Sequence, residues 1–238
     1  MFSRAPLKHI FNDRRMLNCL LAISILVTGF ISLASQRIFA QAEVVYVADI
    51  KGEIDLGLAP YLKRVLRKAD NDGATAVILD ITTPGGRLDA ALEMKNALLE
   101  SRVPTIAFVN GEALSAGALI AIATGKIYMA PGAVLGAATP ILGDSGEIAG
   151  EKTISAVRAA FASVAESRGL DPRIAEAMVD PDIEISGLVE SGKLLTLTNT
   201  VAFELGYSRA TVENMDSLLS NENLDTGTWT SISIGISE

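Results

Sequence analysis

Strand-like and helix-like patterns alternate along residues 44–205, and this alternation predicts an α/β fold with a mostly parallel sheet. A second observation is the apolar, β-branched run ATAVILDI at 74–81, which is typical of a parallel strand covered on both faces. A third is the composition. Because 49% of the residues are hydrophobic and 20% are charged, the chain can form a packed core, which excludes a disordered or collagen-like protein.

The expected elements follow one another with turn residues between them. Apolar runs predict strands at 44–50, 74–81, 104–110, 126–130, 134–138 and 193–197. Amphipathic or small apolar stretches predict helices at 57–71, 87–100, 115–124, 151–168, 171–179 and 198–205. In the first of these helices, Leu58, Leu62 and Val65 fall on one face. We expect residues 139–150 to form a long, glycine-rich loop and the polar tail from Asn221 to fray.

The segment before this body has the pattern of an export signal. Residues 16–36 contain no charge, Arg14 and Arg15 precede them, and Ala40 is a small residue suited to a cleavage site. The run is also long enough to span a bilayer, so a retained signal anchor is the alternative. Because the positive flank stays inside, both readings export the body to the periplasm or another extracytoplasmic space, tethered by residues 16–36 if the leader is kept.

The chain is therefore divided into a leader (1–40), a folded domain (43–210), and a C-terminal helix with a polar tail (211–238). The only histidine, His9, and the only cysteine, Cys19, both lie in the leader. The domain thus has no residues for Ser-His-Asp or Cys-His catalysis, or for a histidine-ligated zinc. Its acidic balance, within a chain of net charge −8, argues against nucleic-acid binding.

Two turns of the predicted sheet carry residues with chemical potential. The first is the stretch from Asp80 to Gly86, where a strand runs into Pro84-Gly85-Gly86 before a helix begins. Glycines can turn their amides into a cleft, and such amides at a helix start can hold an oxyanion or an extended peptide. The alternative interpretation is a tight strand-to-helix turn without a catalytic role.

The second turn leads into the predicted helix at 115–124, with Ser115 at or near its N-terminus. There the helix dipole and the amide of Ala116 favour developing negative charge, and small neighbours leave room for a substrate. The alternative is an ordinary N-cap serine. Since both turns follow the carboxyl ends of consecutive strands, they are expected to meet, with oxyanion donors on one and a serine on the other.

A nucleophilic serine needs a base, and without histidine a lysine is the natural candidate. Among the seven lysines of the body, Lys152 follows the glycine-rich loop at the head of a predicted helix. A helix N-terminus and burial both disfavour the charged ammonium, which suits a lysine that accepts a proton. A solvated lysine at a helix start is the alternative, which spacing alone leaves open.

Ordered motifs then cover about residues 44–208: IKGEID (50–55), DITTPGG (80–86), VNGEALSAGALIAIA (109–123), MAPGAVLGAATP (129–140), EKTISAVRA (151–159) and GLVESGKLLTLT (187–198). In this order they resemble the NfeD family, membrane-associated serine proteases of the ClpP class that are distantly similar to signal peptide peptidase A. The resemblance implies a ClpP/crotonase-like ββα spiral and a Ser-Lys dyad. Within the matching motifs the family serine falls on Ser115 and the lysine on Lys152, while Gly85, Gly86 and Ala116 supply amides for the oxyanion and the substrate.

The expected function is therefore a serine endopeptidase that cleaves apolar segments of membrane-associated proteins through an acyl-enzyme, without metal or cofactor. The resemblance also implies a stomatin-like membrane protein as partner or substrate, and a homo-oligomer, at least a dimer. The long form of the family continues into membrane spans and a small barrel that this sequence does not contain. Two other functions remain as alternatives: a crotonase-type acyl-CoA enzyme, and a non-catalytic scaffold of a membrane complex.

Overall fold

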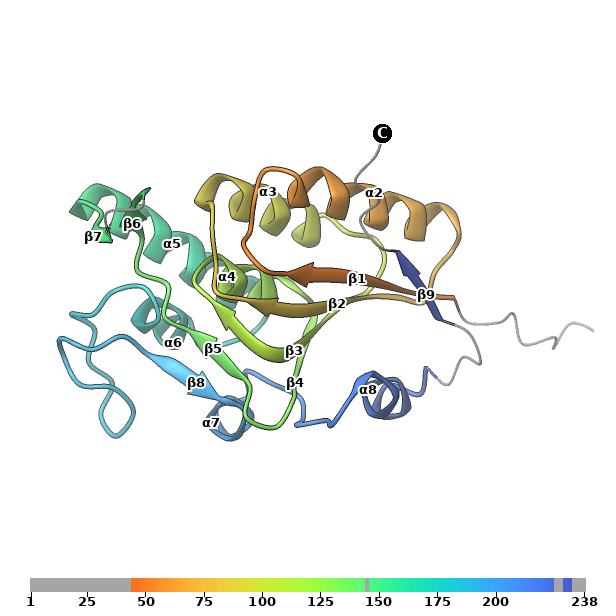
Figure 1. Ribbon diagram of the computed structural model, residues 1–238. Coiled ribbons are helices and arrows are strands. Elements are labelled where there is room, and N and C mark those ends of the chain that lie inside the picture. Colours follow the sequence, from red (N-terminus) through yellow and green to blue (C-terminus); the bar gives the residue numbers. More distant parts are fainter. Residues whose placement is uncertain (1–43, 144–145, 225–228, 233–238) are drawn as a thin grey trace, which may run out of the picture. The chain divides into compact units, whose positions relative to one another are not determined.

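The computed structural model describes residues 44–143, 146–224 and 229–232, so the expected leader lies outside the described residues. Its centre is a parallel sheet of β1 (Val45–Lys51), β2 (Ala76–Thr83) and β3 (Thr105–Leu114). The connections are helices α2 (Leu58–Asn71) and α3 (Leu88–Leu99), which lie together over one face of these strands (Figure 1). The pattern confirms the predicted α/β architecture.

The seven-stranded sheet has the order β8-β5-β3-β2-β1-β9, with β4 paired to β3. Besides its pairing with β2, strand β3 is long enough to pair with two further strands. Its residues 106–109 pair with β4 (Lys126–Met129) and its residues 112–114 pair with β5 (Val134–Gly136). All pairings in this sheet are parallel except the one between β5 and β8 (Thr196–Thr198). The far end of β3 therefore lies between β2 and β5 and carries the chain into α4 (Ala116–Ala123).

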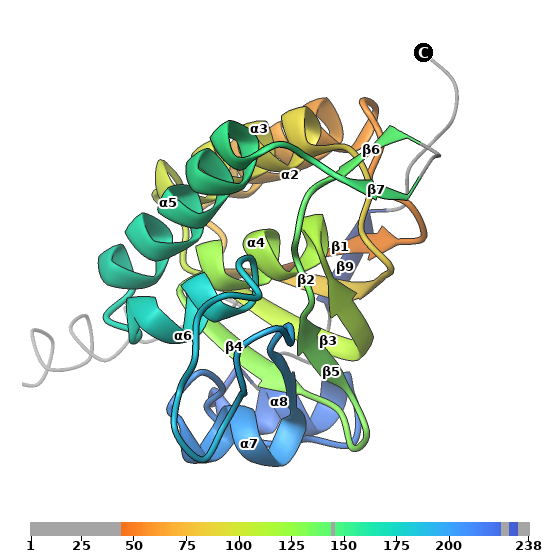
Figure 2. The ribbon, with the colours of Figure 1, turned by 90° about the vertical axis from the view of Figure 1, so that its left-hand side faces the viewer.

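The core forms between the sheet and the helices because each helix presents an apolar side to it. Helix α2 buries Leu58, Leu62 and Val65, as its periodicity predicts. Every residue of α4 is buried, which matches its lack of any charged or polar side chain. Helix α5 (Glu151–Ser167) lies beside α4 and packs with α6 (Pro172–Ala177) (Figure 2). These contacts bring segments that are far apart in sequence to one end of the sheet.

Two polar clusters attach the outer helices to this core. The guanidinium of Arg168 donates from Nε to the carbonyl of Ala123 at 3.0 Å and from Nη2 to that of Leu98 at 3.2 Å, closing the ends of α4 and α3. Glu222, directly after α8 (Met215–Asn221), accepts from Lys126 and Tyr128 at 2.5 Å each. The second cluster holds α8 against β4.

Three expectations about local structure are wrong. The segment 139–150 contains a short hairpin of β6 (Ile141–Leu142) and β7 (Glu147–Ile148). The strand expected at 193–197 begins at residue 196, because the backbone of Leu195 bonds instead to Ala177 and Ala137; α7 (Asn199–Glu204) follows it. Residues 229–232 of the tail do not fray but form β9 (Trp229–Ile232), parallel to β1. The open edge of β1 supplies its partner groups, which sequence reading cannot foresee.

Candidate active site

Ser115 lies at the junction of β3 and α4, in a backbone conformation that residues other than glycine rarely adopt. Its φ is 52° and its ψ is −120°, and its side chain makes no capping hydrogen bond. Ser115 therefore occupies the N-cap position of α4 without capping the helix through its side chain. Its own amide donates to the carbonyl of Gly136 on β5 at 2.9 Å, which holds the strained turn in place. Such strain at a strand-to-helix turn is typical of an exposed nucleophile.

The Pro-Gly-Gly turn meets this serine, as the sequence predicts. A Cβ atom built on Gly85 would lie 2.6 Å from the Ser115 Cβ and 3.1 Å from its Oγ, so only glycine permits the approach. Ile54 pairs with the turn from its other side: its amide donates to the Gly85 carbonyl, and its carbonyl accepts from the Arg87 amide, both at 2.8 Å. This pairing leaves the amide of Gly86 directed away from Ile54.

The three predicted amide donors differ in availability. The Gly85 amide donates to Oγ1 of Thr83 at 3.1 Å, so it is already engaged. Within the described part of the chain, the amides of Gly86 and Ala116 have no hydrogen-bond partner. Ala116 is the first residue of α4, where a backbone amide has no partner inside the helix. Two donors therefore remain beside Ser115, one from each turn.

These residues border a cavity of about 940 Å³. Ser115, Ala116, Pro84 and Gly86 form one side of it. Its other walls come from α4, α5, the segment after β5 and the hairpin, and most of their side chains are apolar: Leu119, Val157, Phe161, residues 137–140, Ile141 and Leu142. The charged side chains among its lining residues are those of Glu53 and Arg87. The site therefore offers both apolar side chains and polar groups to an extended chain beside the serine.

Lys152 does not have the burial expected of it. It is the second residue of α5, it is exposed, and it is not among the residues that line the cavity. The reason is helical geometry. Thr153, Val157 and Phe161 face the cavity, whereas Lys152 shares an exposed stripe with residues 156 and 159. The structure thus brings together Ser115, Gly85, Gly86 and Ala116, and leaves Lys152 in solvent at the head of a helix that forms the cavity wall.

Sequence reasoning missed several parts of the site. Ile54 pairs with the Pro-Gly-Gly turn, Thr83 engages the Gly85 amide, and Phe161 closes the cavity from α5. The helical spacing of Val157, Phe161 and Val164 in the sequence is a signal that identifies the inward face of α5. No comparable local signal marks Ile54, because its role depends on a bridge to a turn more than thirty residues away.

Comparison with known proteins identifies the chain as a member of one family. The family model for the NfeD1b N-terminal domain matches residues 44–231 of this sequence. Membrane protein NfeD1b from Bacillus subtilis (strain 168) is 41% identical over 192 residues, 79% of this chain and 44% of its own length. Membrane-bound protease PH1510 from Pyrococcus horikoshii is 34% identical over 187 residues, 76% of this chain and 40% of its own. The chain thus spans about two fifths of the length of these curated relatives.

Solved structures agree with the fold. A lysine-to-alanine variant of the 1510-N membrane-bound stomatin-specific protease, in complex with a substrate peptide, has a TM-score of 0.72 and 28% identity over 82% of this chain and 94% of its own. A serine-to-alanine variant of the same protease has a TM-score of 0.68 and 28% identity over 80% and 98%. ClpP1 from Listeria monocytogenes, at 19% identity and a TM-score of 0.56 over 72% and 94%, shares the fold.

The architecture is therefore ClpP-like, as the motifs led us to expect. Among the described residues, no helix combines the length and apolar character needed to cross a membrane. With a family model matched along most of its length, the chain belongs to the NfeD1b family through its N-terminal, ClpP-like domain.

Proposed function

We propose that this chain is a serine endopeptidase in which Ser115 is the nucleophile. The observation that carries the proposal is the strained turn at Ser115, with φ of 52°, beside the amides of Gly86 and Ala116, which have no partner among the residues that the structure describes. A relative with 34% identity bears the name of a membrane-bound protease, and the similar solved structures are serine-to-alanine and lysine-to-alanine variants of such an enzyme. These variants support a Ser-Lys dyad, here Ser115 and Lys152.

The proposed reaction proceeds through an acyl-enzyme. Neutral Lys152 accepts the proton of Ser115 Oγ, which attacks the carbonyl carbon of the scissile bond. The amides of Gly86 and Ala116 donate to the resulting oxyanion, a contribution of about 3 kcal/mol for each donor in comparable sites. The lysine ammonium then protonates the leaving amine, the peptide bond breaks, and water hydrolyses the ester by the same steps in reverse order. No metal or cofactor takes part.

The exposure of Lys152 implies one conformational step in this mechanism. Lys152 lies in the first turn of α5, directly after Gly150 and the hairpin, and its neighbour Thr153 already lines the cavity. A rotation of this first turn carries the long lysine side chain from solvent toward Ser115. We propose that an extended peptide in the cavity, packed against the hairpin and α5, favours that rotation, because it excludes water from the site.

The proposed substrate is an apolar segment of a membrane-associated protein. Leu119, Val157 and Phe161 form an apolar wall close to the serine. The hairpin extends this surface outward with Ile141, Leu142 and Ile148, which are 58%, 54% and 60% exposed. Because 1510-N is described as stomatin-specific, a stomatin-like membrane protein is the proposed partner or substrate. We further propose an extracytoplasmic location, tethered through residues 16–36 if the leader is kept, and assembly as at least a dimer.

The test measures hydrolysis of a fluorogenic peptide with apolar residues on both sides of the cleaved bond, together with labelling by a fluorophosphonate. Ser115→Ala and Lys152→Ala should each lower turnover by about a thousandfold or more. Ser220→Ala, on an exposed serine of α8, and Lys95→Ala are the matched controls and should retain wild-type rates. Retention of activity in Lys152→Ala would disprove the dyad but not the nucleophile.

The same experiment separates the alternatives. Peptide binding that Ser115→Ala leaves unchanged, without any turnover by the wild type, would favour a scaffold. Hydration of an acyl-CoA without serine labelling would favour a crotonase-type enzyme.

A further inference from the structure

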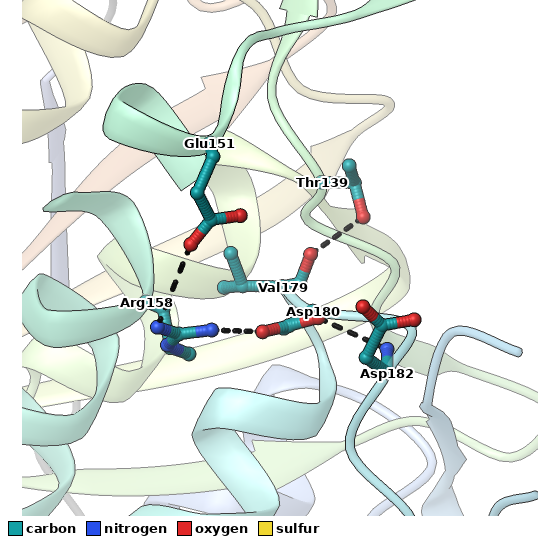
Figure 3. Close-up of polar contacts among 6 residues, drawn as sticks. All are labelled: Thr139, Glu151, Arg158, Val179, Asp180 and Asp182. Atoms are coloured by element: carbon teal, nitrogen blue, oxygen red, sulfur yellow. Dashed lines mark hydrogen bonds and ion pairs between the residues drawn. The ribbon is translucent and has the colours of Figure 1, made fainter. Parts of the chain in front are cut away.

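A partly buried ion pair connects α5, which lines the cavity, to the segment that follows α6. Arg158 of α5 contacts the carboxylate of Asp180, which follows α6 and is only 7% exposed (Figure 3). The other oxygen of the Asp180 carboxylate accepts the backbone amide of Asp182 at 2.9 Å. Arg158 also faces Glu151 in the first turn of α5, at 3.9 Å. Neither Arg158 nor Asp180 lines the cavity, and the mechanism above uses neither.

On one side, Asp180 belongs to a segment that holds the chain after β5. The carbonyl of Met178 accepts the amide of Ala138 at 2.6 Å, and the carbonyl of Val179 accepts the hydroxyl of Thr139 at 2.6 Å (Figure 3). Ala138 and Thr139 both line the cavity. They follow closely on Gly136, whose carbonyl holds the Ser115 amide. The segment that ends at Asp180 is thus fixed relative to the nucleophile.

On the other side, Arg158 lies six residues along α5 from Lys152, the proposed base, which is a little under two helical turns. Thr153 and Val157 of the same stretch line the cavity. The ion pair at Arg158 therefore connects α5 to the segment that binds residues 138–139. Solvent screens exposed ion pairs, so they constrain the groups that they connect only weakly. This pair is more enclosed, because the Asp180 side chain is 10% exposed and the Arg158 side chain is 29% exposed.

We propose that Arg158 and Asp180 are positioning residues, which hold the second turn of α5 in place so that the rotation of the first turn proposed above brings Lys152 to Ser115. This inference rests on the proposed function and assigns the pair a role in it. Ion pairs taken out of water contribute little net stability when compared with apolar replacements, and in some proteins they instead fix one arrangement of the groups they connect. A small displacement of a reacting group from its working geometry lowers the rate strongly, by about a hundredfold for a shift near 1 Å.

The test uses the full chain and the fluorogenic peptide named above. Asp180→Asn keeps the shape of the side chain and an acceptor for the Asp182 amide, but removes the charge that Arg158 contacts. Arg158→Met removes the other partner, and Arg158→Lys restores a positive charge. We expect kcat to fall by about ten- to a hundredfold in Asp180→Asn and Arg158→Met, and to recover in part in Arg158→Lys.

Hydrogen exchange provides a second readout that does not depend on turnover. In Asp180→Asn the amides of residues 151–157 should exchange faster, whereas those of α2 stay unchanged. Glu190→Gln is the matched control, because Glu190 forms a well-exposed ion pair with Lys193 in the same part of the chain. It should change neither kcat nor exchange.

The outcomes separate this inference from the function on which it rests. Unchanged kcat and unchanged exchange in Asp180→Asn would overturn the positioning role alone. A fall in kcat with faster exchange throughout α2 and α5, and no recovery in Arg158→Lys, would also overturn it, because the pair would then support only the general fold. Full turnover by Ser115→Ala would instead overturn the proposed function.

Discussion

Replacement of Gly85 by alanine perturbs the contact that brings the two turns of the site together. Gly85 has a φ of 113°, which a residue with a side chain rarely adopts. The new methyl group would lie 2.6 Å from the Cβ of Ser115, 3.1 Å from its Oγ, and 3.2 Å from the carbonyl of Leu114. These neighbours are backbone or short side-chain atoms next to the backbone, so they cannot move away without displacing the serine.

The magnitude follows from two contributions. The unfavourable φ costs about 1–3 kcal/mol. The overpacking against Ser115 costs about another 1–3 kcal/mol. Together they predict that the free energy of unfolding falls by about 2–6 kcal/mol, on the order of 10 °C in the melting temperature of a chain of this size. Any relief of the contact shifts Ser115 from the amides of Gly86 and Ala116, so kcat should fall by about a hundredfold.

The matched control is Gly73→Ala at the end of α2. Gly73 has a φ of 66°, but a Cβ built on it meets nothing within 4 Å. Its replacement should cost about 1–2 kcal/mol and leave kcat unchanged. Urea unfolding and peptide hydrolysis measure both variants. If Gly85→Ala were no less stable than Gly73→Ala and hydrolysed the peptide at the wild-type rate, our assignment of the Gly85–Ser115 contact to the site would be refuted.

Three further variants test other parts of the structure. Phe161→Leu should enlarge the cavity and raise kcat/KM for peptides with a bulky aromatic residue relative to leucine, as measured with a matched peptide pair. Arg168→Met should lower the free energy of unfolding by about 1–3 kcal/mol per charged hydrogen bond lost at the ends of α3 and α4, measured in urea. Burial alone would raise the pKa of Glu222, but hydrogen bonds from Lys126 and Tyr128 outweigh it and lower the pKa. The contribution of this carboxylate to the free energy of unfolding is therefore present at neutral pH and is lost as the pH falls through the lowered pKa. Between neutral pH and about pH 3, the free energy of unfolding should therefore fall less in Glu222→Gln than in the wild type.

Local pattern was sufficient for most of the fold. The strands at the centre of the sheet and the helices between them lie where apolar runs and helical spacing predict them, because burial on two faces or on one face leaves a period in the sequence. The positions of Ser115 and of the Pro-Gly-Gly turn at strand ends followed from the same pattern. Their meeting followed from parallel topology, in which consecutive strands end at one edge.

The features that the sequence analysis missed or predicted wrongly have a common physical cause. The Gly85 amide engages Thr83, the short hairpin pairs residues 141–142 with 147–148, and β9 adds to the edge of β1. In each case the hydrogen-bond partner depends on where the backbone turns in space, and no periodic pattern in the sequence indicates that position. The orientation of Lys152 is similar, because a shift of one residue on a helix rotates a side chain by about 100°.

Reading the amino-acid sequence was enough to predict the α/β architecture, the absence of histidine from the domain, and a serine and a glycine turn at neighbouring strand ends. Only the folded chain shows that the amides of Gly86 and Ala116 have no partner among the described residues, that Ser115 is strained and makes no capping bond, and that Lys152 is exposed to solvent. The reason is that composition and periodicity record which surfaces are buried, whereas hydrogen-bond partners and side-chain directions depend on distances between segments that only the folded chain brings together.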